Sequence, residues 1–366
     1  MQLLENNKKE VTGNRSDLFT PESAGKAREY HRSFAEYAET PLVSLKNLAE
    51  SMGVAGIYVK DESFRFGLNA FKVLGASYTI GKIADTVPED AVFVTATDGN
   101  HGRGVAWTAD RLKRKCIVYL PEGSAKERLD NILALGADAA ILDLSYDECV
   151  DKARRDAEEN GWILIQDTSD EEYDETEAGI MQGYTTMALE AAEQLRRTVP
   201  THVFLQAGVG SMAASAAAFM KNMYGERCPK IIIVEPENAP CLYITAEAQD
   251  GEIHAYGGKL DTMMAGLACG VPCRLAWNIL SGIADWFALI PDSTAAVGMR
   301  KLARPVGNDR PVVSGESGAA GFACALEILK DPDLRSKLEI GGDSVILCFS
   351  TEGDTDRENY IKVING

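Results

Sequence analysis

The feature that most constrains the fold is a series of short apolar runs separated by stretches of helical periodicity. Apolar runs bounded by glycine and proline are typical of buried strands, and helices between such strands indicate parallel pairing. Amphipathic helices are expected, for example, over residues 181–197 and 212–223. The pattern predicts an α/β protein with mainly parallel, twisted sheets flanked by helices. The expected strands are Gly56 to Val59, Ala91 to Thr95, Lys115 to Leu120, Ala139 to Leu142, Trp162 to Gln166, His202 to Leu205, Ile231 to Val234 and Ser344 to Phe349.

Length and charge narrow the class of protein. The chain has 366 residues, enough for two domains with a core each, and 45% hydrophobic with 25% charged residues is ordinary for a globular protein. The formal net charge of −18 opposes binding to nucleic acid or to anionic membrane surfaces. The first ten residues contain no apolar signal region, and no apolar run reaches about eighteen residues. A cytoplasmic protein without nucleic-acid or membrane partners is expected.

Eight cysteines are spread along the chain without the Cys-x-x-Cys pairs or Cys/His clusters that hold zinc. We therefore expect no metal site and mostly reduced thiols. Cys241 and Cys269 lie in two loop-like stretches that could meet in the fold, which leaves a disulfide between them open.

Lys72 is the first candidate for chemistry. It lies in Ser-Phe-Arg-Phe-Gly-Leu-Asn-Ala-Phe-Lys72-Val-Leu-Gly-Ala-Ser, among apolar and small residues and without an obvious salt-bridge partner. Desolvation lowers the pKa of a lysine, and a neutral amine can form a Schiff base with an aldehyde such as pyridoxal phosphate. The alternative is a surface lysine at the start of a helix.

A glycine-rich loop follows the expected strand that ends at Thr95. It reads Thr97-Asp98-Gly99-Asn100-His101, and such a loop exposes backbone N–H groups that can hold a carboxylate or a phosphate. The alternative is a tight turn in which Asp98 or Asn100 caps a helix.

A second glycine-rich loop follows the expected strand His202 to Leu205. By the same physics it is a phosphate-binding loop. It also fits the pattern G-x-G-x-x-A, and Glu235 ends the next strand about where a nucleotide-binding fold places its ribose acid. A nucleotide-dependent dehydrogenase or binding protein is the alternative, but it assigns no role to Lys72. The phosphate would meet the residues Gly208, Val209, Gly210, Ser211 and Met212.

Two further polar clusters lie near the C-terminus, in residues 314–319 and 350–356. Hydroxyls and carboxylates at the end of a strand in an α/β sheet fall where ligands usually bind. Calcium binding is a weak alternative, since the spacing of the acids is not that of an EF-hand loop. The acidic run Asp170 to Glu177 is interpreted as a solvated loop.

Taken in order, these segments resemble the fold-type II (tryptophan synthase beta-like) pyridoxal-phosphate enzymes and, among them, the diaminopropionate ammonia-lyases. The resemblance runs from about residue 15 to the C-terminus. It rests on six ordered motifs, Phe64 to Lys72, Thr97 to Trp107, Ile180 to Tyr184, Met264 to Gly270, Ser314 to Gly318 and Ser350 to Asp356.

The resemblance implies a role for each candidate toward pyridoxal 5'-phosphate. Lys72 would form the Schiff base, and Asn100 would bond the ring oxygen of the coenzyme. Residues 208–212 would bind the phosphate through backbone amides. The ring nitrogen would lie near Ser350 or Thr351, a choice that the sequence leaves open.

The reaction implied by the resemblance converts D- and L-2,3-diaminopropionate to pyruvate and ammonia. Lys72 would take the α proton, while Asp98 could attract the β-ammonium group and take a proton from the opposite face. Asp167 matches a second acidic position of the family and could pair with the substrate amine. The substrate-binding loop would comprise Thr97, Asp98, Gly99 and His101.

One segment departs from the family pattern. The family usually has Trp-Glu-Gly-Tyr and then Ile-Pro-x-Trp after the second aspartate, whereas residues 170–179 of this chain lack two of those aromatics and the proline. The substrate could therefore be another amino acid with a leaving group on its β carbon, used by a dehydratase or lyase. A surface variation without functional effect is the alternative.

The resemblance also predicts the domain organisation. Residues 1–75 and 191–366 would form a large coenzyme-binding domain and residues 76–190 a small domain, with the active site in the cleft between them. A homodimer that acts on a small amino-acid substrate is expected from the family.

Overall fold

The computed structural model describes residues 1–8, 15–97, 99–167 and 174–366. It contains two sheets, one of seven strands in the order β1-β10-β9-β8-β11-β3-β2 and one of four strands in the order β6-β5-β4-β7. The large sheet comprises β1 (Gln2–Glu5), β2 (Leu42–Ser44), β3 (Gly56–Asp61), β8 (His202–Gln206), β9 (Lys230–Pro236), β10 (Trp286–Ile290) and β11 (Val345–Ser350). The small sheet comprises β4 (Val92–Ala96), β5 (Lys115–Leu120), β6 (Asp138–Ile141) and β7 (Ile163–Leu164).

Pairing is parallel inside both sheets. The exceptions are β1, antiparallel to β10, and β2, antiparallel to β3. Each of the eight apolar runs predicted as strands overlaps a strand, although β7 is reduced to two residues. The predicted α/β class with mainly parallel sheets is confirmed. The prediction missed β1, β2 and β10, of which only β10 carries a continuous apolar run that could have been recognised.

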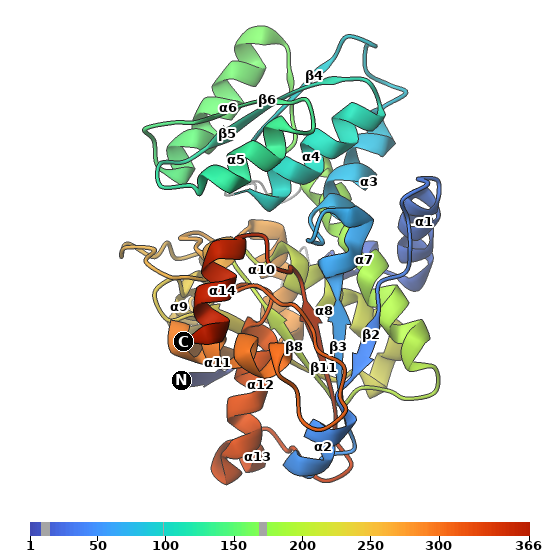
Figure 1. The fold of residues 1–366 in the computed structure, drawn as a ribbon, viewed down its shortest axis with the longest axis vertical. Helices are drawn as coiled ribbons and strands as arrows, with labels where there is room; N and C mark the ends of the chain where they lie inside the picture. Colours follow the sequence, from blue (N-terminus) through green and yellow to red (C-terminus); the bar gives the residue numbers. More distant parts are fainter. Residues whose placement is uncertain (9–14, 98, 168–173) are drawn as a thin grey trace.

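Helices cover the sheets. In Figure 1, α4, α5 and α6 accompany the four-stranded sheet at the top, and the seven-stranded sheet with its helices fills the lower part. The helices are α1 (Pro21–Arg32), α2 (Lys46–Met52), α3 (Val73–Ile83), α4 (Asn100–Arg111), α5 (Lys126–Leu133), α6 (Tyr146–Asn160), α7 (Glu175–Leu195), α8 (Ser211–Tyr224), α9 (Cys241–Ala248), α10 (Arg274–Ile283), α11 (Asp292–Ala303), α12 (Ala320–Lys330), α13 (Pro332–Lys337) and α14 (Arg357–Asn365). Short 3-10 helices are η1 (Ser16–Leu18), η2 (Glu62–Gly67), η3 (Gly225–Arg227) and η4 (Ala265–Leu267).

The two helices predicted over residues 181–197 and 212–223 are α7 and α8. Helix α7 begins at Glu175, six residues earlier than expected, because the Asp174 side chain accepts a hydrogen bond from the Glu177 backbone N–H at 2.8 Å and caps the helix. The acidic run Asp170 to Glu177 was interpreted as a solvated loop. For its last three residues, 175–177, this is wrong, because they form the start of α7. Glu177 is a buried helical residue that accepts a hydrogen bond from the Cys273 thiol.

Helices α3 and α7 cross at two glycines. A Cβ atom on Gly183 would lie 2.8 Å from the Gly75 Cα atom, so only hydrogen at that position permits the approach. This contact fixes α3, which begins directly after Lys72, against the part of α7 that carries Tyr184.

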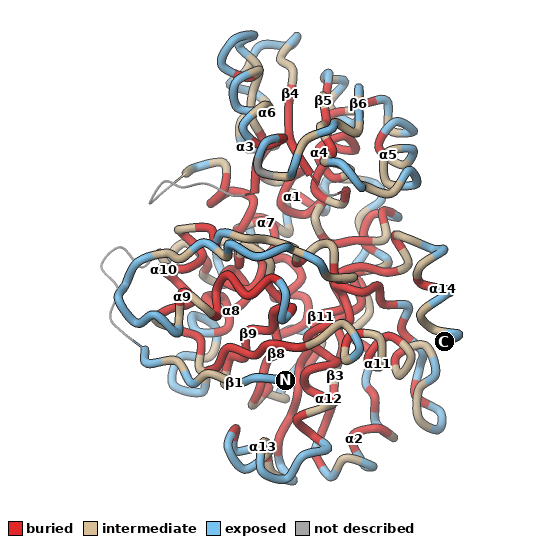
Figure 2. The backbone as a smooth tube through the Cα atoms, turned by 90° about the vertical axis from the view of Figure 1, so that its left-hand side faces the viewer, coloured by how far each residue is buried: buried red, intermediate tan, exposed pale blue. Residues whose placement is uncertain are grey.

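The core follows the strands of both sheets. Figure 2 shows β3, β8, β9 and β11 buried along most of their length, while the exposed residues lie in peripheral helices and turns. In the described part of the chain, no helix is both long and apolar enough to cross a membrane.

Candidate active site

A cavity of about 620 Å³ lies where the carboxyl ends of strands from both sheets meet. Parallel strands bring their following loops to one edge, which is where ligands bind in α/β sheets. From the small sheet, the cavity receives residues that follow β4, β5, β6 and β7. From the large sheet, it receives residues that follow β8 and β11. The polar lining residues used below are Lys72, Thr97, Asn100, His101, Asp167, Gln206, Ser211, Ser317, Thr351 and Glu352.

Lys72 is the N-cap residue of α3, and its amine points to the Asp167 carboxylate, with which it forms a hydrogen-bonded ion pair. The residues around Lys72 in the sequence show no obvious salt-bridge partner, and the structure places a distant one beside it. Asp167 lies 95 positions further along the chain, so local sequence gave no sign of it. The expected apolar frame is present, since the Lys72 Nζ atom lies 5.7 Å from the Phe71 ring centroid and 5.9 Å from that of Tyr184.

Asp167 is buried, with 5% of its surface exposed. Burial by itself would raise its pKa, but the charges of Lys72 and then His101, together with the hydrogen bond from Lys72, outweigh burial and lower the pKa to about 2. The His101 Nδ1 atom lies 3.9 Å from Asp167, and the other ring nitrogen is 2.8 Å from the Ile165 carbonyl oxygen. Asp167 is therefore a carboxylate at neutral pH.

The loop after β4 is held by Thr97. Its hydroxyl oxygen accepts hydrogen bonds from the backbone N–H groups of Gly99 at 2.9 Å and Gly102 at 3.1 Å. The alternative in which Asn100 caps α4 is wrong, because its side chain donates to Glu352 instead. Asp98, predicted to be catalytic and substrate-binding, lies outside the described residues.

Asn100 and Glu352 join the two sides of the cavity. The Asn100 amide nitrogen lies 2.6 Å from a carboxylate oxygen of Glu352, which follows β11. Glu352 was not predicted as a site residue. Glu352 could have been recognised as a candidate, because it lies in the polar run after the last strand. Its contact with Asn100 could not, because no sequence pattern connects the two residues.

Ser350 and Thr351 occupy different surroundings. Ser350 is buried, and its hydroxyl donates to the Ser314 hydroxyl at 2.7 Å. Thr351 lines the cavity, and its hydroxyl oxygen accepts from the Gln206 side-chain nitrogen at 2.9 Å. The same nitrogen donates to the Phe349 carbonyl at 2.8 Å, which fixes the orientation of the Gln206 amide.

Residues 208–212, which comprise the end of the loop after β8 and the first two residues of α8, line the cavity. Gly210, the N-cap residue, has a φ of 102°, and the first N–H groups of α8 have no partner within the helix. A Cβ atom on Gly208 would lie 2.8 Å from the Cys269 sulfur and 3.2 Å from the Gly266 carbonyl oxygen. These features fit a bound phosphate group. The Ser211 hydroxyl instead donates to the Asp167 carbonyl oxygen at 3.1 Å.

Glu235, which suggested a ribose-binding acid, serves another purpose. Its two carboxylate oxygens accept from the backbone N–H groups of Leu242 and Tyr243, each at 2.7 Å, at the start of α9. Burial raises the pKa of Glu235 to about 8. A fully buried group that caps a helix leaves no carboxylate for a ribose, so the nucleotide alternative retains only its glycine pattern.

Cys241 and Cys269 are both free thiols, without the disulfide that the sequence left open. Both are next to Gly208: the Cys241 thiol is 3.4 Å from its carbonyl oxygen. Within residues 1–8, 15–97, 99–167 and 174–366, no group of three or more potential ligands is arranged to hold a metal ion.

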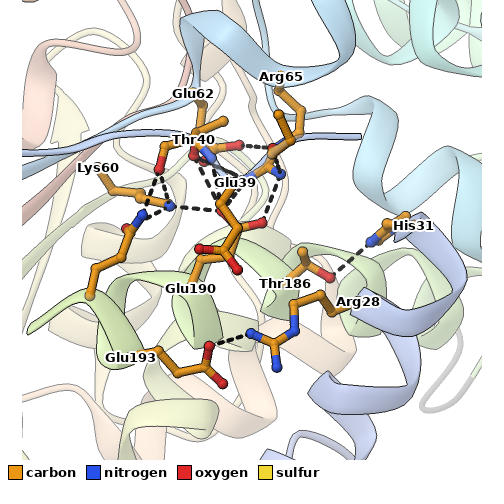
Figure 3. A network of polar contacts seen from close by, with 12 residues as sticks. Arg28, His31, Glu39, Thr40, Lys60, Glu62, Arg65, Thr186, Glu190 and Glu193 are labelled. Atoms are coloured by element: carbon orange, nitrogen blue, oxygen red, sulfur yellow. Dashed lines mark hydrogen bonds and ion pairs between the residues drawn. The ribbon is translucent and has the colours of Figure 1, made fainter. Parts of the chain in front are cut away.

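A closed ionic network supports the segment that leads to Lys72. It consists of Lys60, Glu62, Arg65 and Glu190, whose side chains are all fully buried (Figure 3). Arg65 binds Glu62 at 2.8 Å and Glu190 of α7 at 2.8 Å, and Lys60 lies 2.7 Å from Glu190. The sequence assigned these residues no role. Their effect is to attach η2 to α7 close to the site.

Comparison with known proteins identifies the class. Residues 34–352 match the family model described as "Pyridoxal-phosphate dependent enzyme". The chain therefore belongs to the pyridoxal-phosphate-dependent enzymes. A solved structure of threonine deaminase isoform 2 from Solanum lycopersicum shares this fold, with a TM-score of 0.79 at 22% identity over 100% of this chain and 96% of that one.

Closer relatives identify the family within that class. The diaminopropionate ammonia-lyase of Escherichia coli (strain K12) is 44% identical over 96% of this chain and 94% of its own length. Its counterpart in Salmonella typhimurium is 43% identical over 98% and 95%. A crystal structure of the Escherichia coli enzyme "in complex with aminoacrylate-PLP azomethine reaction intermediate" has a TM-score of 0.92 at 44% identity, covering 99% of this chain and 96% of that one. The chain belongs to the diaminopropionate ammonia-lyase family.

Proposed function

We propose that this protein is a carbon-nitrogen lyase that uses pyridoxal 5'-phosphate to eliminate ammonia from D- and L-2,3-diaminopropionate, with pyruvate as the product. Its family and the near-complete coverage of its relatives support this function. The observation that carries it is the Lys72–Asp167 pair in a cavity that also contains the loop 208–212. When bound, the coenzyme supplies a conjugated ring that delocalises the negative charge formed at the substrate's α carbon.

Lys72 would hold the coenzyme covalently, and its freed amine would be the base that removes the α proton of the substrate. Asp167 acts through its charge. Because its pKa is lowered to about 2, it cannot donate a proton at neutral pH, but it stabilises the ammonium that Lys72 becomes after taking the proton.

Asp98 is assigned from its position in the sequence alone. Its carboxylate would attract the substrate's β-ammonium group and could remove the α proton from the face opposite Lys72, which would allow both enantiomers to react. Thr97 and His101 line the cavity, and with Gly99, assigned from its place in the sequence, they would bind the substrate's carboxylate.

The coenzyme-binding residues follow from the cavity. Backbone N–H groups of residues 208–212 would hold the phosphate, and Asn100 the ring oxygen. Thr351 is a better partner for the ring nitrogen than Ser350, because Thr351 lines the cavity. Since Gln206 donates to the Thr351 oxygen, the hydroxyl hydrogen remains available to donate to an unprotonated ring nitrogen.

A different β-substituted amino acid is the second candidate substrate. One observation favours it, namely that a solved structure of the Escherichia coli enzyme, 42% identical to this chain, is "in complex with D-serine". The segment 170–179, of which residues 170–173 lie outside the described residues, departs from the family pattern and is compatible with a different substrate.

The organisation of the molecule is proposed on the same basis. Residues 76–190 form the small domain, supported by the four-stranded sheet lying wholly within them, and residues 1–75 and 191–366 form the large domain. We expect a homodimer, as in the family. A cytoplasmic location is supported by eight free thiols, since disulfides are favoured in oxidising compartments.

The test is pyruvate release from D- and L-diaminopropionate, serine and threonine by the coenzyme-loaded enzyme. We expect turnover of both diaminopropionate isomers with kcat/KM at least about tenfold above that for either hydroxy amino acid, because a second ammonium group complements the carboxylates of the cavity. Turnover of serine without either diaminopropionate isomer would favour the second substrate. A protein that neither binds the coenzyme nor becomes labelled at Lys72 by borohydride would reject both.

A further inference from the structure

Glu352 is a buried carboxylate at the junction of three segments. It is 3% exposed and lines the cavity. One of its oxygens accepts from the Asn100 amide at 2.6 Å and from the Thr355 hydroxyl at 3.2 Å. The other accepts from the Ser317 backbone N–H at 3.2 Å. All three partners are neutral donors, so these contacts of the buried carboxyl group are hydrogen bonds rather than ion pairs.

The backbone around Glu352 is attached to the segment that carries Lys72. Ala70 and Glu352 form an antiparallel bridge. The Phe71 backbone N–H donates to the Thr351 carbonyl at 3.0 Å, and the Gly353 N–H donates to the Asn69 carbonyl at 2.9 Å. Glu352 therefore has a fixed position relative to Lys72. Because the Asn100 side chain donates to Glu352, the Asn100 amide at the start of α4 is held in the same frame.

We propose that Glu352 is a positioning residue that sets the plane of the Asn100 amide for the coenzyme. This inference rests on the proposed function. The Asn100 nitrogen carries two hydrogens, of which Glu352 accepts one. The second can be donated to the ring oxygen of the coenzyme, and the charged acceptor on the first strengthens the amide as a donor.

Only a carboxylate satisfies this arrangement. The two oxygens of Glu352 accept from the Asn100 side chain and from the Ser317 backbone N–H, and the Ser317 group can only donate. A glutamine has the same shape, but it keeps its oxygen toward Ser317 and presents its NH2 group to Asn100. The Asn100 amide must then flip or move away, and in both cases its NH2 group loses the orientation that Glu352 gives it.

The test uses Glu352→Gln, with Glu316→Gln as the matched control. Glu316 is also buried and bonded by a side-chain amide, that of Asn359, but among the described residues it is not one that lines the cavity. The measurements are the coenzyme dissociation constant, the wavelength of the visible absorption band, and the unfolding temperature of the coenzyme-free protein.

We expect Glu352→Gln to weaken coenzyme binding about tenfold and to shift the visible band. The unfolding temperature of the coenzyme-free protein should change no more than in Glu316→Gln, which should keep the wild-type affinity and band. Loss of affinity in both variants, or wild-type affinity and band in Glu352→Gln, would overturn the proposal.

A double-mutant cycle with Asn100→Ala separates positioning from packing. If Glu352 acts through Asn100, the double variant binds the coenzyme no more weakly than Asn100→Ala alone. Additive losses would show that Glu352 acts by another route and would also overturn the proposal. Should Glu352→Gln not fold, Thr355→Val, which removes one donor to Glu352, is expected to shift the band in the same direction by less. Failure of the wild-type protein to bind the coenzyme would instead reject the proposed function.

Discussion

Two lysines in the same part of the chain, Lys60 and Lys72, pair with carboxylates, but their surroundings differ. Lys60 is fully buried and donates to Thr40, Gln194 and Glu190, within a network in which Arg65 adds further bonds. The side chain of Lys72 keeps 21% of its surface exposed to the cavity and forms its ion pair with Asp167.

The difference separates an ion pair that is closed off in the interior from one that a ligand can reach. In the network around Glu190, the charges satisfy one another and a change in any of them leaves another uncompensated in a closed interior. In the Lys72–Asp167 pair, the amine can be reached through the cavity and can exchange its partner for a ligand. A lysine that reacts must be accessible to its ligand, which Lys72 is through the cavity and the buried Lys60 is not.

The largest expected effect is on catalysis, from Lys72→Ala. We expect kcat for diaminopropionate to fall at least about a thousandfold, because the base that removes the α proton is gone. The coenzyme should still bind through the loop 208–212, although borohydride should no longer attach it. Lys82→Ala is the control, since Lys82 lies in the last turn of the same helix. Activity that survives Lys72→Ala would place the reactive amine elsewhere.

The next effect is on stability, from Glu190→Ala. We expect the free energy of unfolding to fall by about 3 to 5 kcal/mol, because Lys60 and Arg65 are left buried without their shared carboxylate. Glu193→Ala is the matched control in the same helix, where the pair with Arg28 is half exposed (Figure 3) and should contribute at most about 1 kcal/mol. Urea unfolding measures both. Equal losses of unfolding free energy in the two variants would contradict the distinction between the buried ion pairs of Glu190 and the partly exposed pair of Glu193.

The fold could be predicted to a large extent because buried parallel strands leave a continuous apolar signal. Each predicted run overlaps a strand, whereas β1 and β2 are short edge strands with little apolar content to reveal them. Part of the candidate site follows from the local sequence. Glycines between a strand and a helix mark a helix N-terminus, and the structure has one at Gly210. That residues 208–212 bind the phosphate stays a prediction.

Side-chain pairs across the molecule were not predictable by the same reasoning. Asp167 and Asn100 follow strands of the small sheet, whereas their partners Lys72 and Glu352 follow strands of the large sheet. Their contacts depend on how the two sheets face each other, which no local pattern encodes. The choice between Ser350 and Thr351 likewise depends on which of two adjacent side chains faces the cavity.

The smallest expected effect concerns the acid stability of the Lys72–Asp167 pair in the coenzyme-free protein. The pKa of Asp167 is lowered from 3.8 to about 2 in the folded state, because Lys72 and His101 outweigh the effect of burial. As the pH falls, the unfolded state therefore binds this proton first, so the stabilisation is complete above about pH 4 and is lost as the pH approaches about 2. We expect Asp167→Asn to reduce the free energy of unfolding by about 2 kcal/mol at pH 6 and by about half as much at pH 3. Urea unfolding at both pH values, with the exposed Asp90→Asn as control, measures the difference. A deficit in Asp167→Asn that is the same at both pH values would mean that Asp167 stabilises the fold through packing rather than through its charge.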